Sequence, residues 1–207
     1  MSITFIIIAI TVAVTVYTWN QPELQYKLML NPYSISKKNE YFRFITSGFI
    51  HQDFIHLGFN MFTFYFFGQA IEYIYSNFFG ELGPFLFVAL YLVGIVVSDL
   101  PTYLKHKENP GYNSLGASGG VSAVVFSSIL FYPLNEICFY GLLCFPGFIL
   151  GALYIIYSIY MGKKSMNNIN HDAHLYGALF GIAFSILIRP AVFVTFLEQV
   201  ATYRPFS

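Results

Sequence analysis

Long apolar runs separated by shorter polar segments dominate the chain, and they predict helices. A helix needs about 20 apolar residues to cross the roughly 30 Å hydrocarbon core of a bilayer. Six runs reach or approach that length, and each predicts a transmembrane helix: residues 3–19, 54–75, 82–104, 115–132, 138–161 and 172–189. We therefore expect an all-α integral membrane protein in which residues 1–207 form a single membrane domain of six helices.

The segments outside these runs refine that arrangement. Residues 20–53 form a long first loop with two prolines, four cations and many aromatic residues. A loop of that length usually has a function or structure of its own. Residues 191–200 are apolar but too few to span, so they predict an interfacial helix. No Lys or Arg precedes the first run and no small-residue cleavage pattern follows it, which favours a retained helix over a signal peptide.

Composition supports a membrane protein and excludes other classes. The 207 residues are 57% hydrophobic and 10% charged with a mean hydropathy of +0.61, whereas soluble domains carry about 25% charge. The net charge is zero, so nothing indicates a nucleic-acid partner. Cys138 and Cys144 are the only cysteines, and their apolar surroundings favour small apolar filling over a disulfide or a thiolate metal site. We expect no metal and no cofactor.

Polar residues at membrane depth are costly and are commonly functional. Four groups occur: His51, His56 and Asn60 at the second run, Asp99 near the end of the third, Ser118 at the start of the fourth, and His171, Asp172 and His174 at the start of the sixth. We expect Asp99 to reach the interface, and His171 and Asp172 to face headgroups or loop water.

Topology brings three of these residues to one depth. The second, fourth and sixth helices each follow an odd-numbered loop, so they all start from the same side of the membrane. His56, Ser118 and His174 each lie about one turn inside their helices. A serine, a histidine base and further donors at one depth form an arrangement suited to acyl transfer. Asn60 follows His56 by four residues, so the two share a helix face.

Small residues predict close packing of the fourth and sixth helices. They are Gly116 and Gly119 beside Ser118, and Gly177 and Gly181 on the stripe of His174. Close packing would bring the His174 ring to the Ser118 hydroxyl. It also predicts that leucine at Gly181 is severely disruptive and that alanine is milder. Each feature has a simpler interpretation, since glycines commonly serve packing alone and a membrane histidine can merely form hydrogen bonds between helices.

The ordered set of motifs resembles the rhomboid family of intramembrane serine proteases, in its compact six-helix bacterial form. The resemblance covers about residues 40–185, and its parts are Arg43, His56-x-x-x-Asn60, Gly68-x-x-x-Glu72, Gly116-Ala117-Ser118-Gly119 and Ala173-His174-x-x-Gly177-x-x-x-Gly181. It implies that Ser118 is the nucleophile and His174 the general base, as a dyad. It also implies an oxyanion hole formed by His56, Asn60 and the Ser118 backbone N–H, a first loop anchored by Arg43, and a structural Glu72.

The resemblance also implies the class of substrate, and the sequence differs from the family pattern at two positions. The substrates would be transmembrane proteins that enter sideways from the lipid bilayer and unwind at the scissile bond. The fifth helix, with Pro146-Gly147, is then a candidate gate. Phe42 stands where the family usually has Trp, and Ser122 stands where it often has a Tyr that stacks on the base. Either another group holds the His174 ring, or the ring is held more loosely.

Two signals for orientation disagree. The first, third and fifth loops hold eight of the ten Lys and Arg residues, which by the positive-inside rule places the active-site face in the cytoplasm. The bacterial family has that face outside. We follow the family and expect a multi-pass protein of the bacterial inner membrane with its active site facing outside.

Other functions fit some of these residues. A catalytically inactive rhomboid-like protein would bind transmembrane clients, although the intact Ser118 and His174 argue against it. A small transporter would use the same polar residues to line a path. The Gly-x-Ser-x-Gly pattern also occurs at the nucleophile elbow of α/β-hydrolases, but that elbow follows a strand, and residues 105–113 are polar and loop-like.

Overall fold

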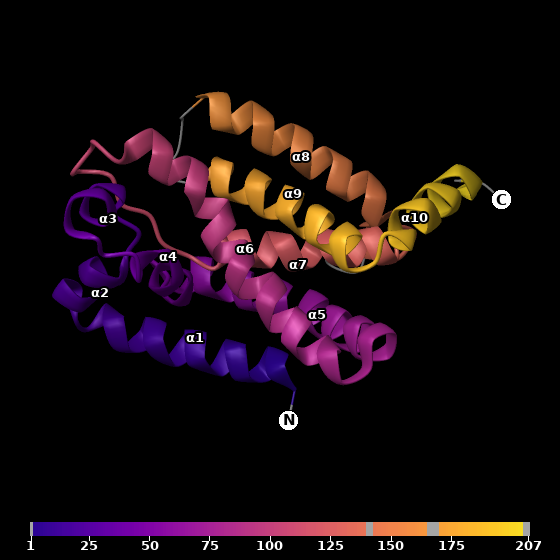
Figure 1. The fold of residues 1–207 in the computed structure, drawn as a ribbon, viewed down its shortest axis with the longest axis horizontal. Coiled ribbons are helices and arrows are strands. Elements are labelled where there is room, and N and C mark those ends of the chain that lie inside the picture. Colours follow the sequence, from indigo (N-terminus) through magenta and orange to yellow (C-terminus); the bar gives the residue numbers. More distant parts are fainter. Residues whose placement is uncertain (1, 140–142, 165–169, 205–207) are drawn as a thin grey trace.

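Helices make up most of the protein, and the computed structural model describes residues 2–139, 143–164 and 170–204. The helices are α1 (Ile3–Trp19), α2 (Pro22–Leu28), α3 (Pro32–Lys38), α4 (Arg43–Thr46), α5 (Phe54–Phe79), α6 (Gly83–His106), α7 (Ser118–Phe131), α8 (Gly147–Lys164), α9 (His171–Ile188) and α10 (Ala191–Thr202), with 3-10 turns η1 (Ser47–Phe49) and η2 (Gly80–Leu82). The long helices form a bundle in which α8 lies beside α9 and α1 lies on the opposite side (Figure 1). The predicted helical fold is confirmed.

The number of membrane spans is not confirmed. In the part of the chain that the structure describes, two stretches are long and apolar enough to cross a membrane. One is Phe54–His106, which contains both α5 and α6, and the other is α9. The helices α1, α7 and α8 are apolar but shorter. Six spans therefore stay a prediction. The helix expected at residues 191–200 is present as α10.

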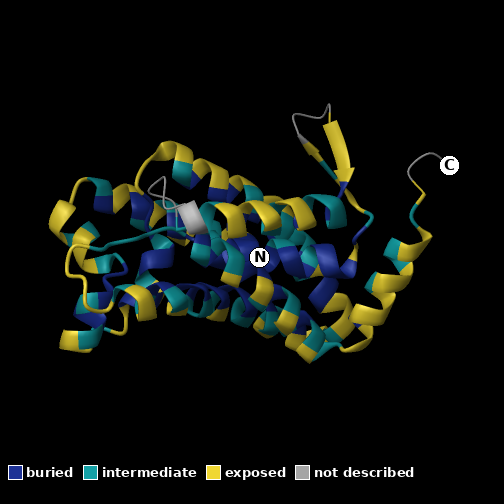
Figure 2. Ribbon diagram, turned by 90° about the horizontal axis from the view of Figure 1, so that it is seen from above, coloured by how far each residue is buried: buried dark blue, intermediate teal, exposed yellow. Residues whose placement is uncertain are grey.

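A disulfide-linked hairpin replaces the first part of the predicted fifth span (Figure 2). Strand β1 (Glu136–Phe139) pairs antiparallel with β2 (Leu143–Pro146), and Cys138 lies opposite Cys144. These cysteines form a disulfide, so the expectation of unpaired apolar cysteines is wrong. Helix α8 begins only after Pro146 because proline suits a helix start and cannot donate a backbone hydrogen bond, while the Ile and Phe residues before it favour extended backbone. Run length alone could not distinguish these structures.

Buried residues form the centre of the bundle (Figure 2), and α7 lies there, in contact with α5, α6, α8 and α9. Eleven of the 14 residues of α7 are buried. Small residues allow α6 to approach its backbone: a Cβ on Gly120 would lie 2.8 Å from the Tyr91 carbonyl oxygen, and one on Gly94 would lie 2.9 Å from Ala123. The first residue of α7, Ser118, is therefore set into the bundle.

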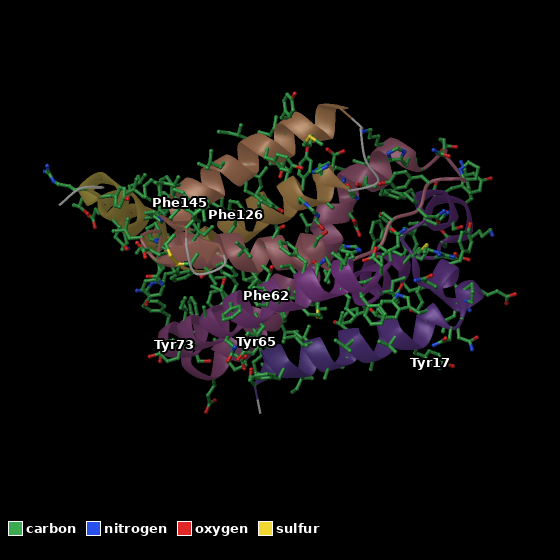
Figure 3. The ribbon with its side chains drawn as sticks, turned by 180° about the vertical axis from the view of Figure 1, so that it is seen from behind. Tyr17, Phe62, Tyr65, Tyr73, Phe126 and Phe145 are labelled. Carbon is green, nitrogen blue, oxygen red and sulfur yellow. A yellow bond between two sulfur atoms is a disulfide. The ribbon has the colours of Figure 1, made fainter. Side chains whose placement is uncertain are left out.

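Aromatic side chains project from the outside of the bundle. Tyr17 of α1 and Phe62, Tyr65 and Tyr73 of α5 are labelled in Figure 3, and all four are exposed, although the Tyr65 ring also meets Phe5 of α1 edge-on. An apolar outer surface of this extent suits contact with lipid, because soluble proteins rarely expose large apolar patches.

The first loop has a structure of its own, as predicted, and Arg43 lies at its centre. The buried guanidinium binds the Glu40 carboxylate at 2.6 Å and donates to the backbone oxygens of Tyr26 and Met29, each at 2.9 Å. It also lies 5.6 Å from the centre of the Phe42 ring. A buried charge needs such partners. Arg43 therefore connects the end of α2 to α4, as expected of an anchor for this loop.

Glu72 of α5 caps the amino terminus of α1. Its carboxylate accepts hydrogen bonds from the hydroxyls of Ser2 and Thr4 and from the backbone N–H groups of Ile3 and Thr4, at 2.6–3.0 Å. The first N–H groups of a helix have no partner within the helix and attract negative charge. Glu72 thus joins two helices far from Ser118, which fits the structural role that the resemblance implies.

Candidate active site

An extended segment leads into α7, and the first loop holds it in place. Leu30 forms an isolated bridge with Ser114, and the Gly116 N–H donates to the Ser47 carbonyl at 2.9 Å. Gly116 has φ +124°, which L side chains rarely adopt. A Cβ there would also lie 2.8 Å from Nε2 of His56. Glycine is therefore required both by the backbone conformation and by the approach of the His56 ring.

His51, in the turn before α5, supports the residue that precedes the serine. The Ala117 N–H donates to Nε2 of His51 at 3.3 Å, and Nδ1 lies 3.2 Å from the Thr15 hydroxyl of α1. Burial lowers the pKa of His51 to about 3, so the ring is neutral at pH 7. A neutral ring can accept at Nε2 while it donates at Nδ1. The sequence singles out His51 as polar but does not predict this supporting contact.

Ser118 is the first residue of α7 and borders a small polar cavity. The polar side chains that line the cavity are Ser47, Ser98, Asp99, Ser114, Ser118 and Asn170. Because the first N–H groups of a helix lack intrahelical partners, those of Ser118 and Gly119 can donate to a ligand. A cavity with several polar partners is also suited to holding water beside the serine hydroxyl.

Asp99 does not reach the interface, so that prediction is wrong. It is 9% exposed and borders the cavity, and the Ser47 hydroxyl lies 3.5 Å from its carboxylate. The neighbouring Ser98 also faces α7, and its hydroxyl would collide with a Cβ on Gly119. Asp99 is covered because α6 packs against both α9 and the first-loop helix α4, an arrangement that its position near a helix end does not reveal.

His171 is also buried, in contrast to its predicted contact with headgroups or loop water. It is 5% exposed because α8 covers it, and the Tyr157 ring lies edge-on to it with 5.7 Å between ring centres. Asp172 behaves as predicted: it is partly exposed and lies 3.6 Å from the Lys105 ammonium at the end of α6. The two neighbours on one helix therefore face different surroundings.

Helices α7 and α9 touch backbone to backbone, which confirms their predicted close packing. A Cβ on Gly177 would collide with the Gly119 carbonyl oxygen, and one on Gly181 would collide with that of Ala123. Gly119 directly follows Ser118, and Gly177 lies one turn after His174. The serine and the histidine therefore lie at the same end of the α7–α9 contact.

Asn170 fixes the start of α9, and with it His174. Its side-chain oxygen accepts from the Ala173 N–H at 3.1 Å, as an N-cap does. The same side chain exchanges hydrogen bonds with the Thr102 hydroxyl of α6 at 3.0 and 3.1 Å.

The His174 ring stacks nearly parallel to the ring of Tyr154 from α8, with 6.2 Å between the centres and 17° between the planes. The position of His174 thus depends on residues from α6 and α8.

His56 and Asn60 lie in the first two turns of α5, and the His56 ring approaches the segment that leads to Ser118. Asp53 caps α5 by accepting the His56 N–H at 2.8 Å, which sets the depth of the histidine. The His56 ring lies against Gly116, two residues before Ser118. Asn60 is buried and donates one N–H of its amide to the His56 carbonyl at 2.9 Å, which leaves its second N–H for another acceptor.

Tyr154 is one of the residues of this site that the sequence did not single out, and Asn170 and the serines of the polar cavity other than Ser118 are others. Ser122 in the usual position of an aromatic residue indicates that either another group holds the His174 ring or the ring is held more loosely. Nothing in the sequence identifies which residue of the fifth helix faces that ring, because the rotation of one helix against another depends on packing.

The fold and the site define a helical membrane-protein bundle with polar residues gathered at one end of three helices. A family model described as the Rhomboid domain matches residues 38–191, and the chain belongs to the rhomboid family. The predicted resemblance is thus confirmed at the level of the family.

Two curated proteins of Arabidopsis thaliana are similar to this chain. It is 29% identical over 174 residues to "RHOMBOID-like protein 12, mitochondrial", which covers 73% of this chain and 49% of that protein. It is 30% identical over 157 residues to "Rhomboid-like protein 11, chloroplastic", which covers 72% of this chain and 52% of that protein. The chain therefore spans about half the length of these relatives. Their names do not support the expected bacterial inner membrane.

Proposed function

We propose that this protein is an intramembrane serine endopeptidase that cleaves transmembrane segments with a dyad of Ser118 and His174. The observation that carries the proposal is the backbone contact of Gly177 with Gly119, which brings the starts of α7 and α9 together. It favours an enzyme over a transporter, because residues that merely line a path do not require the two helices that carry the serine and the histidine to pack backbone to backbone.

In this mechanism His174 accepts the Ser118 proton as the hydroxyl oxygen attacks the scissile carbonyl. The His56 ring, the second N–H of Asn60 and the Ser118 backbone N–H donate to the oxyanion that forms. His174 then protonates the leaving amine. Water from the polar cavity hydrolyses the acyl-enzyme, and the proton returns through His174. No step requires a metal or a cofactor.

The substrate class follows from the position of the site. Ser118 lies at a helix start in a bundle with an apolar outside, so the substrate that reaches it is a membrane segment with local unwinding, since an intact helix hides its carbonyl groups. Helix α8 contacts chiefly α9 and lies on the outside of the bundle (Figure 1), which makes it the candidate gate for lateral entry.

The principal test uses purified protein and a panel of transmembrane substrates. Ser118→Ala and His174→Ala should each reduce cleavage to background, because removing either member of a dyad leaves no activated nucleophile. Ser128→Ala, the same change further along α7, serves as the matched control and should keep the wild-type rate. Substrate that binds without Ser118-dependent cleavage would instead identify an inactive protein that binds transmembrane clients.

The oxyanion residues make a second test. His56→Ala and Asn60→Ala should each lower kcat by about 10²–10³-fold with little change in KM, because these donors act on charge formed in the transition state. A loss that appears only in KM would assign the two side chains to substrate binding or packing.

A further inference from the structure

Tyr154 of α8 contacts both helices that carry the proposed dyad. Its ring stacks on His174 of α9, with 6.2 Å between centres and 17° between planes. Its hydroxyl shares a 2.8 Å hydrogen bond with the Ser122 hydroxyl of α7. The same ring also meets Phe126 of α7 at 5.5 Å, a residue labelled in Figure 3. Tyr154 is therefore oriented by α7 and presents a flat face to the base on α9.

The hydrogen bond to Tyr154 explains why a serine suits position 122. Ser122 lies one turn after Ser118 and is buried, but its side chain is too short to stack on a ring. Its hydroxyl instead fixes the far end of Tyr154. We propose that Tyr154, held by Ser122, is the positioning residue for the His174 imidazole, an inference that rests on the proposed function and adds the residue that orients its base.

Two neighbours of His174 on its own helix, His171 and Asp172, do not supply this parallel contact. The His171 ring meets it edge-on, with 6.0 Å between centres and 76° between planes. Asp172 lies two residues away on the same helix and pairs with Lys105 at 3.6 Å. Within the described ranges, Tyr154 gives the parallel contact that restricts rotation of the imidazole about its last bond.

Tyr154 links the movement of α8, the candidate gate, to the orientation of the His174 ring. The nucleophile is on α7 and the base is on α9, but the group that orients the base is on α8, which lies outermost (Figure 1). When α8 moves aside to admit a substrate, the Tyr154 ring leaves His174 and its hydrogen bond to Ser122 breaks. The base is then correctly oriented only after α8 has closed over the substrate.

Kinetic measurements on cleavage test this role. Tyr154→Leu removes the ring and should lower kcat about a hundredfold with KM changed less than about twofold, because a displacement of about 1 Å has such an effect on rate. Tyr154→Phe and Ser122→Ala each remove only the hydrogen bond and should lower kcat about three- to tenfold. The double variant should lose no more than either single one, since both changes break the same interaction.

Tyr157→Leu is the matched control, because it removes a ring one turn further along α8 that contacts His171 instead. It should keep a kcat close to that of the wild type. Equal losses in Tyr154→Leu and Tyr157→Leu, or a loss in KM alone, would overturn the positioning role and leave Tyr154 as ordinary packing.

A measurement independent of cleavage separates this inference from the proposed function. In protein labelled at histidine, the His174 ring protons should be shifted upfield by the Tyr154 ring, retain that shift in Tyr154→Phe and lose it in Tyr154→Leu. An unchanged His174 signal in Tyr154→Leu would overturn the inference, whatever the activity. The expected shift in a protein without Ser118-dependent cleavage would uphold the contact and overturn the proposed protease.

Discussion

Helix α9 is held in two different ways by its neighbours α7 and α8. Against α7 it presents glycines, and a Cβ at Gly177 or Gly181 would collide with backbone carbonyl oxygens. Against α8 it presents rings, through the contacts of His174 with Tyr154 and of His171 with Tyr157. Backbone contacts allow almost no adjustment, whereas side chains can rotate. The comparison suggests that the distance between α7 and α9 is fixed, while α8 can separate and return.

Further along the α7–α9 contact, polar side chains support the same rigidity. The Ser185 hydroxyl donates to the Ser127 hydroxyl at 2.7 Å, and the Tyr75 hydroxyl of α5 lies 2.9 Å from Ser127. All three are buried, so each depends on the others for its hydrogen bonds.

The largest effect is expected from breaking the α7–α9 contact. Gly181→Leu should abolish cleavage and lower the melting temperature, since overpacking of a core typically costs 1–3 kcal/mol. Gly181→Ala should also be severe, because the Cβ itself meets the Ala123 carbonyl. Leucine should still be the more severe of the two, as the sequence predicts, because it adds further side-chain atoms at the same contact. Gly58→Ala is the control, because nothing lies within 4 Å of its added Cβ. Wild-type melting in Gly181→Ala would contradict the backbone contact.

An intermediate effect is expected at the hairpin that precedes α8. Cys138→Ser with Cys144→Ser removes the disulfide, and closing so short a loop contributes about 2 kcal/mol in the chain-entropy model. The loss of stability should be confined to the hairpin and the start of α8. The rate of cleavage should fall less than about threefold. The rate of proteolysis near residue 146 measures the local loss of stability. A loss of activity as large as that of Gly181→Ala would show that α8 is as rigidly held as α7.

The smallest effect is expected from Gly151→Ala, which places the same added methyl group on α8. Its Cβ would meet Ile129 and Phe126 side-chain atoms at 3.3 and 3.4 Å, and these side chains can move. Melting temperature and kcat should stay close to those of the wild type. A change as large as that of Gly181→Ala would mean that α8 packs as tightly as α7 does, and the proposed difference between the two neighbours would fail.

The sequence predicted the features that depend on periodicity and on spacing. The helical runs, the first loop with its own structure, and the approach of Gly177 and Gly181 to the helix of Ser118 all follow from local patterns. Those patterns could not place Asp99, His171 or Tyr154, because the burial of a side chain and the helix that it faces depend on how separate helices pack. The disulfide was missed because an apolar run with a Cys pair fits a helix as well as a hairpin. The assignment of Ser118 and His174 as a dyad stays a prediction.

The disulfide also bears on which compartment each end of the bundle faces. The Cys138–Cys144 bond follows the far end of α7, about 20 Å from Ser118 by the rise of a 14-residue helix. Disulfides persist in oxidising surroundings and are rare where thiols are kept reduced. If the hairpin lies on an oxidising side, Ser118 opens toward the reducing one. The eight cations of the odd-numbered loops favour the same sidedness. If α7 separates the two sides in this way, redox chemistry and charge would both favour the orientation opposite to that expected from the bacterial family, and the oxidation state of the Cys138–Cys144 pair would report which side the hairpin faces.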